Sequence, residues 1–138
     1  MTKTIPTKLS DIKRSWHLVD VKDKILGRIS TEIAKKLMGK NKPYFVPNLD
    51  CGDYVVVLNC TGIIVTGKKM DQKIYRHYSG FPGGQKQKKM KVVLVEHPER
   101  IIKESVSGML PKNKLRDSML RRLYIYKDEI HPYKNKFV

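Results

Sequence analysis

The spacing of apolar residues predicts a chain in which strands and helices alternate. Between Leu26 and Met38 apolar residues recur every three or four positions, which is typical of an amphipathic helix, and Gly39 follows where a helix-ending glycine is expected. The run at 53–59 (DYVVVLN) is almost unbroken in apolar and β-branched residues, which is typical of a strand buried on both faces of a sheet. Prolines and a glycine indicate a loop over residues 40–53, between these two elements.

The remaining pattern predicts shorter elements. Further strands are expected at residues 16–21, 63–66, 73–78 and 123–126, the third of them at a sheet edge. Pro98 and Pro111 suit the first turns of two more helices, and residues 92–95 form a short helix or strand. A glycine-rich and then lysine-rich loop is expected at 79–91. Strands that alternate with helices favour the α/β class, with helices covering a sheet.

Composition and charge indicate a polyanionic partner. The 138 residues fit one domain, and a hydrophobic content of 40% is sufficient for a core. The 29 Lys and Arg residues outnumber 13 Asp and Glu, which gives a formal net charge of +16, whereas about 2–8 suffices for the solubility of a small domain. Such an excess repels itself in the folded state, so a polyanionic partner is the natural explanation. The alternative is an ordinary basic cytosolic protein.

A membrane or secreted location is a weaker expectation. The longest apolar stretch, residues 54–58, is far shorter than a spanning helix, and the N-terminal residues contain no apolar segment typical of a secretory signal. Cys51 and Cys60 match neither a disulfide framework nor a zinc motif, so we expect two reduced thiols in a cytosol-like compartment. No membrane partner is therefore expected.

Motifs that would support enzymatic chemistry are incomplete. Residues 62–68 have the spacing of a phosphate-binding loop, but Lys69 stands where that loop needs Ser or Thr to hold magnesium. No two histidines have metal-ligand spacing, and no nucleophile motif occurs. Asp50 and Asp53 are expected to shape a turn rather than to form a catalytic pair. We therefore expect no catalytic residue, metal, cofactor or small-molecule substrate.

The positive signal is a concentration of cations between residues 66 and 91. Lys and Arg recur there against a single acid, Asp71, and tyrosines, glutamines and glycines lie among them. Because cations contact phosphates and aromatic faces stack on unpaired bases, this segment predicts a nucleic-acid surface. Residues 80–83 match the GxxG of a KH domain, but Pro82 lacks an N–H donor, so a flexible loop is expected there. The lack of a recognition-helix or zinc-finger pattern favours folded RNA over DNA.

The candidate RNA contacts follow from these patterns. The cations expected to neutralise phosphates are Arg14, Lys24, Arg28, Lys40, Lys42, Lys68, Lys69, Lys73, Arg76, Lys86, Lys88, Lys89, Lys91, Lys112, Lys114 and Arg121. Gly80, Gly83 and Gly84, next to Ser79, leave room for a close approach of the backbone to RNA. Tyr75 is a candidate for stacking on a base, and a core or edge-strand position fits Tyr75 and Tyr78 equally well.

Several long stretches of the sequence resemble one known family. They are WxxVDxxxxxLGR, GKxKPxxxPxxDxGDxVVVxN, TGKK followed by KxYxxxSGxPGG, and GMLPKN, in this order between about Lys13 and His131. The chain thus resembles the thirteenth protein of the large ribosomal subunit, in its bacterial and organellar form. This resemblance implies a three-layer α/β/α domain on a small, mainly parallel four-stranded sheet. It also implies binding to large-subunit ribosomal RNA, a role in subunit assembly and translation, and neighbouring ribosomal proteins as partners.

The chain departs from the family pattern near its C-terminus. Residues 115–117 are Leu-Arg-Asp where the family has Leu-Gly-Arg, and Asp128 stands where it has a glycine. The family's phosphate contact is therefore not carried over to position 117, and the neighbouring Arg116 is the alternative candidate for it. Such drift suits a divergent bacterium or an organelle, so the expected location is a cytoplasmic or organellar ribosome.

The expected organisation is a basic arm at residues 1–14, one domain at 15–131 and a tail at 132–138. The expected function is that of a structural ribosomal protein that binds RNA. A free regulator of expression that binds RNA or DNA is the alternative, because the same basic surface would serve it.

Overall fold

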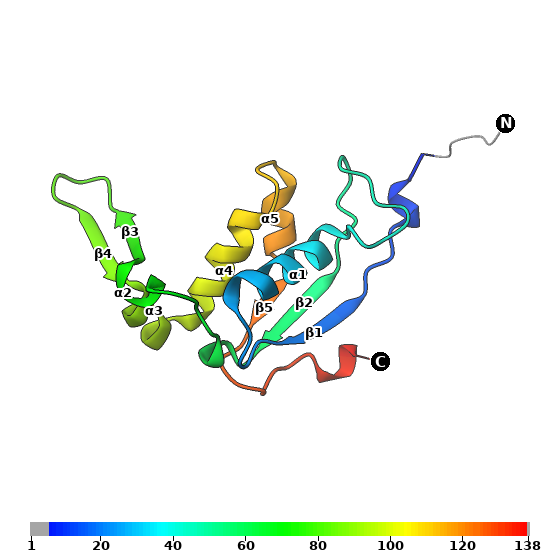
Figure 1. Ribbon diagram of the computed structural model, residues 1–138. Coiled ribbons are helices and arrows are strands. Elements are labelled where there is room, and N and C mark those ends of the chain that lie inside the picture. Colours follow the sequence, from blue (N-terminus) through cyan, green and yellow to red (C-terminus); the bar gives the residue numbers. More distant parts are fainter. Residues whose placement is uncertain (1–5, 138) are drawn as a thin grey trace.

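The computed structural model describes residues 6–137, which form a body and a projecting hairpin (Figure 1). The body contains β1 (Trp16–Asp20), α1 (Leu26–Met38), β2 (Tyr54–Leu58), α4 (Pro98–Met109), α5 (Leu115–Leu120) and β5 (Leu123–Ile125). The hairpin consists of β3 (Ile74–Tyr78) and β4 (Gln85–Lys89), flanked by the short helices α2 (Lys69–Gln72) and α3 (Met90–Glu96). Short 3-10 turns occur at Leu9–Asp11, Cys60–Gly62 and Lys134–Lys136. Among the described residues, no helix is long and apolar enough to cross a membrane.

The main sheet is parallel and has the strand order β1-β2-β5. Trp16 pairs with Tyr54 at its start, and β2 lies in the centre. This arrangement confirms the α/β class and the buried central strand, but the sheet has three strands in the described part of the chain, not the expected four. Residues 63–66 form no strand, because only an isolated parallel bridge joins Ile25 and Ile64.

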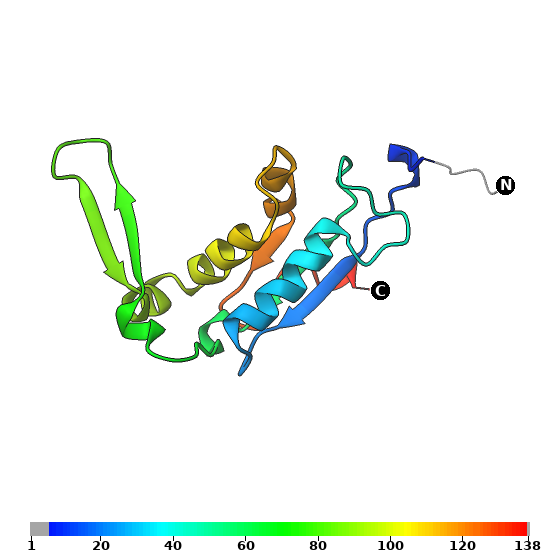
Figure 2. The ribbon, with the colours of Figure 1, turned by 45° about the horizontal axis from the view of Figure 1, so that its top comes forward.

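Helices α1 and α4 lie side by side on one face of this sheet (Figure 2). Val19, Val55 and Val57 belong to the core beneath them and are almost fully buried. Ile33 of α1 and Ile102 of α4 are fully buried in the same core. The helical periodicity read from the sequence therefore marks the faces that the two helices turn toward the sheet.

The opposite face of the sheet is covered by the C-terminal segment. Trp16 stacks on Tyr54 with ring centroids 4.4 Å apart, and Tyr133 of the C-terminal segment lies 5.0 Å from the Trp16 ring. Phe137 meets the same indole edge-on at 6.3 Å. The expected second layer of helices is absent from residues 6–137, because these large aromatic rings cover the narrow sheet themselves.

Strands β3 and β4 form an antiparallel hairpin outside the main sheet, with Ile74 opposite Lys89 and Tyr78 opposite Gln85. The expected strand at 73–78 is thus confirmed, whereas the loop expected at 79–91 is wrong in its second half. Every residue of β4 is exposed, so no alternation of apolar and polar residues marks it in the sequence. The ambiguous residues 92–95 lie in helix α3.

Asp50 and Arg122 form an ion pair at the C-terminal end of α1. The terminal nitrogens of Arg122 donate to the two carboxylate oxygens at 2.5 and 2.6 Å, and Nη2 also donates to the carbonyl of Leu37 at 3.3 Å. The expected turn is present as well, since Gly52 N donates to Asp50 Oδ1 at 3.3 Å. A Cβ atom on Gly52 would lie 1.6 Å from the Leu37 carbonyl oxygen, so only glycine permits this approach.

Asp53 is a buried carboxylate beside this ion pair, and it is 5% exposed. It accepts hydrogen bonds from Lys42 Nζ at 2.5 Å, Ser15 N at 2.9 Å and His17 Nε2 at 2.9 Å. Burial raises the pKa of the Asp53 carboxyl, but the hydrogen bonds from Lys42, Ser15 and His17 outweigh burial and hold that pKa below its ordinary 3.8. The carboxylate therefore stabilises the folded state whenever it is ionised.

We predict that Asp53→Asn lowers the free energy of unfolding at pH 7 by up to about 3–5 kcal/mol, because Lys42 loses its buried counter-charge. The folded pKa of Asp53 is depressed, so its contribution is present above the unfolded pKa and disappears as pH falls through the folded pKa. Denaturant titrations between about pH 7 and pH 2 should therefore show a shallower acid loss for the variant than for the unmodified protein. The exposed Asp128→Asn is the matched control, and an equal acid profile in Asp53→Asn and the unmodified protein would contradict the assignment.

Candidate nucleic-acid interface

The hairpin presents cations on both of its faces. Side chains alternate across a strand, so Arg76 and Lys89 project from one face, and Lys86 and Lys88 project from the other. All residues of β4 are exposed, and the hairpin extends away from the body (Figures 1 and 2). The backbone pairing therefore carries a set of positive charges out to where a large anionic partner can reach them.

Two of the candidate lysines have acidic neighbours on α2 and α3. Lys88 Nζ lies 2.5 Å from the carboxylate of Glu96, and this hydrogen bond holds the pKa of Glu96 below its ordinary value. Lys91 Nζ lies 3.1 Å from Asp71. Both pairs are largely exposed, so they contribute little to stability and leave the lysines near the surface. In the described chain, the cations of this segment without an ion pair are Lys68, Lys69, Lys73, Arg76, Lys86 and Lys89.

Tyr75 occupies a core position rather than a surface one. Its side chain is 7% exposed and belongs to the hydrophobic core, with Lys73 Nζ 5.2 Å and Arg100 Cζ 5.9 Å from the ring centroid. Burial raises the pKa of the Tyr75 hydroxyl, and the neighbouring Glu104 adds to this effect. The core alternative is therefore correct, and Tyr75 fastens the hairpin to α4 instead of presenting a ring to a base.

The exposed aromatic rings of the hairpin are Tyr78 and Phe81. Tyr78 is 63% exposed at the end of β3, and Phe81 is 74% exposed in the turn. Both belong to the aromatic residues of the basic segment that suit stacking, but only Tyr75 is among the candidate RNA contacts read from the sequence. The alternation of side chains along a strand distinguishes the two tyrosines already in the sequence, because it turns Tyr78 and Tyr75 to opposite faces of the hairpin.

Three glycines shape the turn of the hairpin. Gly80 and Gly83 have φ angles of 88° and 70°, and the space where each would carry a Cβ atom is empty. Gly84 is packed differently, since a Cβ atom there would lie 2.0 Å from Ser79 Oγ. Ser79 N donates to the carbonyl of Gly84 at 3.2 Å, which closes the turn. Positive φ at Gly80 and Gly83 and close packing at Gly84 thus explain why glycine occurs at these positions. The backbone at Gly80 and Gly83 is open, so a close approach by RNA stays a prediction.

The candidate cations of the body lie in two regions, one at each end of α1. Lys24 and Arg28 lie at the start of α1, near the hairpin, whereas Lys40 lies beyond its end (Figure 2). Lys40 lines a groove there with residues 111 and 113, so the basic residues after α4 belong to the same end of the body. The exposed cations at or near that end are Lys40, Lys112, Lys114 and Arg121.

Arg14 and Lys42 are turned toward the protein. Arg14 donates to two carbonyl oxygens of the loop at 50–52, at 2.6 and 3.1 Å. Lys42 Nζ donates to two backbone carbonyls at 2.6 and 2.9 Å besides the carboxylate of Asp53. Internal hydrogen bonds and the ion pair to Asp53 account for Lys42. Arg14 keeps 32% of its side chain exposed, so a phosphate contact by Arg14 stays a prediction.

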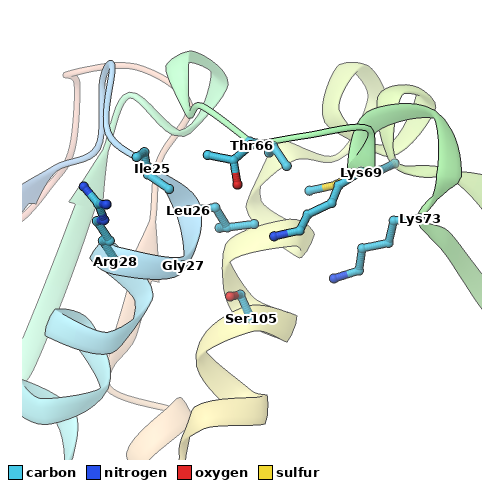
Figure 3. Close-up of a pocket in the computed structure, with 10 residues that line it drawn as sticks. Ile25, Leu26, Gly27, Arg28, Thr66, Lys69, Lys73 and Ser105 are labelled. Carbon is cyan, nitrogen blue, oxygen red and sulfur yellow. The ribbon is translucent and has the colours of Figure 1, made fainter.

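A pocket of about 410 Å³ lies where the body meets the hairpin (Figure 3). It brings together three candidate cations from distant parts of the sequence, Arg28, Lys69 and Lys73. Among the described residues, no group of three or more His, Cys, Asp or Glu side chains could hold a metal ion. The arrangement therefore offers cations, open turns and exposed rings, which suit the binding of a polyanion.

Comparisons with known proteins identify the family of this chain. The sequence model of the family described as Ribosomal protein L13 matches residues 14–132. A protein of Prochlorococcus marinus subsp. pastoris named large ribosomal subunit protein uL13 is 52% identical over 133 residues, which cover 96% of this chain and 93% of the relative. Proteins of the same name from Dehalococcoides mccartyi and Thermotoga petrophila are 49% and 47% identical and cover 94% and 95% of the chain, and 91% and 88% of their own lengths.

These relatives are ribosomal proteins, which confirms the expectation that the chain is not an enzyme. The match extends through β1, the central strand and the hairpin to the start of the C-terminal segment. The resemblance read from the sequence motifs is therefore confirmed, and the chain belongs to the ribosomal protein L13 family.

Proposed function

We propose that this protein is a structural constituent of the large ribosomal subunit that binds large-subunit rRNA and supports subunit assembly and translation. Family membership over residues 14–132 supports the ribosomal part of the proposal. The observation that carries the RNA part is the projecting hairpin, whose exposed cations have no role in the core. Neighbouring proteins of the large subunit are further partners, in a cytoplasmic or organellar ribosome.

The proposed phosphate contacts are the outward-facing cations of the hairpin and of the two ends of α1. They are Lys24, Arg28, Lys40, Lys68, Lys69, Lys73, Arg76, Lys86, Lys88, Lys89, Lys91, Lys112, Lys114 and Arg121. The turn supplies a close backbone approach at Gly80 and Gly83. Tyr78 and Phe81 take the stacking role, because Tyr75 is buried. If about 6–10 of these cations neutralise phosphates at once, affinity falls by about 10³–10⁵ between 50 and 200 mM salt.

Membership of the subunit is tested by sedimentation. In a sucrose gradient of a cell lysate at high salt, a constituent of the large subunit travels with that particle. A free regulator of messenger RNA or DNA stays at the top of the gradient, and this outcome would contradict the proposal.

We predict that the double variant Lys86→Gln and Lys89→Gln weakens binding to a large-subunit rRNA transcript and flattens its salt dependence. These two lysines form no ion pair in the described chain, so their removal affects RNA binding without breaking an ion pair to Glu96 or Asp71. The slope of log K against log salt should fall by about 0.7–0.9 for each phosphate that the variant no longer neutralises. Filter binding at several salt concentrations measures it.

The matched control is Lys103→Gln with Lys127→Gln, which removes the same charge from exposed lysines outside the hairpin. The control accounts for the general fall in net charge. If both double variants have the same affinity and the same salt slope, the hairpin is not the RNA-binding surface.

We further predict that Phe81→Ala and Tyr78→Ala lower RNA affinity with little change in thermal stability. Both rings are mostly exposed, and the loss of one stacked base corresponds to about 1–3 kcal/mol. Tyr75→Ala should instead lower the free energy of unfolding by about 3–5 kcal/mol, because it removes a buried aromatic ring. Thermal unfolding and RNA titration of the three variants separate the two roles, and unchanged RNA affinity in Phe81→Ala and Tyr78→Ala would rule out stacking by these rings.

A further inference from the structure

The pocket between the body and the hairpin gathers polar groups from four segments of the chain. Its walls include the start of α1, the connection at 65–66, the α2 region, and Ser105 of α4. In Figure 3 the side chains of Lys69 and Lys73 extend from the α2 side toward the start of α1, with the hydroxyls of Thr66 and Ser105 nearby. Because these segments are far apart in sequence, the tertiary fold alone creates this concentration of donors.

The two lysines are a like-charged pair at positions i and i+4 of one helical turn. Such a pair is mildly destabilising on its own. In the described chain neither ammonium group forms an ion pair, and no residue that lines the pocket is acidic. Lys73 Nζ lies 5.2 Å from the centre of the Tyr75 ring, so a buried side chain supports its position. An anion between the two ammonium groups would offset their repulsion.

The start of α1 adds hydrogen-bond donors to the same pocket. Leu26 N already donates to the carbonyl of Ile64 at 2.9 Å. The backbone N–H groups of Gly27 and Arg28 form no hydrogen bond in the described chain, and the N-cap residue Ile25 provides no side-chain cap. In a helix of 13 residues these N–H groups carry the positive end of the helix dipole. The space beside Gly27 is open, since a Cβ atom there would meet nothing within 4 Å.

We propose that this pocket is a discrete phosphate-binding site, in which Lys69 and Lys73 bind one side of the phosphate and the N–H groups of Gly27 and Arg28 bind the other. The proposal rests on the proposed function, because the phosphate expected here belongs to the RNA backbone; inorganic phosphate is the second source of the same chemistry. A discrete site differs from a diffuse basic surface in one respect: two lysines share a single phosphate. It also fixes the RNA backbone at the junction of the body and the hairpin, and so sets the orientation of both.

The first test is Gly27→Asp, which places a carboxylate at the start of α1 where there is room for it. An acid in the first turn favours the helix, so the thermal unfolding temperature should be unchanged or higher. The same carboxylate competes with the phosphate, so affinity for a large-subunit rRNA transcript should fall by more than it does in Lys103→Gln, which changes net charge by the same amount. An affinity equal to that of Lys103→Gln in a stably folded Gly27→Asp would overturn RNA binding at this site.

The second test compares Lys69→Gln, Lys73→Gln and the double variant in salt titrations. A shared phosphate predicts that the double variant lowers the slope of log K against log salt by about 0.7–0.9, the value for one phosphate. Two separate phosphates would lower it by about twice that amount and would contradict the shared site. The pair Lys103→Gln with Lys127→Gln again controls for net charge.

The third test separates the sources of phosphate by NMR. Inorganic phosphate added to the unmodified protein should shift the amide signals of Gly27 and Arg28, and it should not do so in Gly27→Asp. If these amides respond to inorganic phosphate while RNA affinity is unaffected by Gly27→Asp, the site takes free phosphate. If the amide signals of residues 27 and 28 respond to neither phosphate nor RNA, the proposed phosphate site does not exist. A protein that binds no rRNA at all would contradict the proposed function instead.

Discussion

The body depends on the buried ion pairs that hold the loop at 50–53 against the end of α1. Asp50 is paired with Arg122 and Asp53 with Lys42, so the loop is bonded to a residue just after α1 and to a residue just after α5. Gly52 lies against the Leu37 carbonyl, at a distance that a Cβ atom would prevent. Removing one partner would leave a charge in a poorly solvated place, which is far more costly than removing a surface pair. The fold therefore requires these residues together.

The cations that form these internal contacts are distinct from the cations of the basic surface. The chain has a net charge of +16, but its cations do not act alike. Lys42 neutralises the buried Asp53, Arg122 neutralises the partly buried Asp50, and Arg14 bonds to carbonyl oxygens nearby. The cations of the hairpin lie on an exposed ribbon that has little core of its own. Self-repulsion among these outward charges is offset when they meet a polyanion, which supports the proposed binding to RNA.

The link between the hairpin and the body decides how that surface is presented. Tyr75 enters the core from β3, and Met90 at the start of α3 is fully buried. These anchors hold the base of the hairpin while its tip, with Tyr78 and Phe81, stays exposed. The pocket between the body and the hairpin lies at the same junction, and its lining brings the start of α1 together with Lys69 and Lys73 at the base of the hairpin.

The sequence by itself determined the α/β class, α1 with its ending at Gly39, the buried central strand, the basic character and the family. Each of these depends on local periodicity, composition or contiguous motifs. Only the tertiary structure decided that the main sheet has three strands within residues 6–137, that β4 is a strand, that Tyr75 is buried and that Arg122 is internal. Arg122 and Asp50 are 72 residues apart, and no local pattern reports such a pairing. An exposed strand likewise carries no apolar alternation, because alternation arises only where one face of a strand is buried.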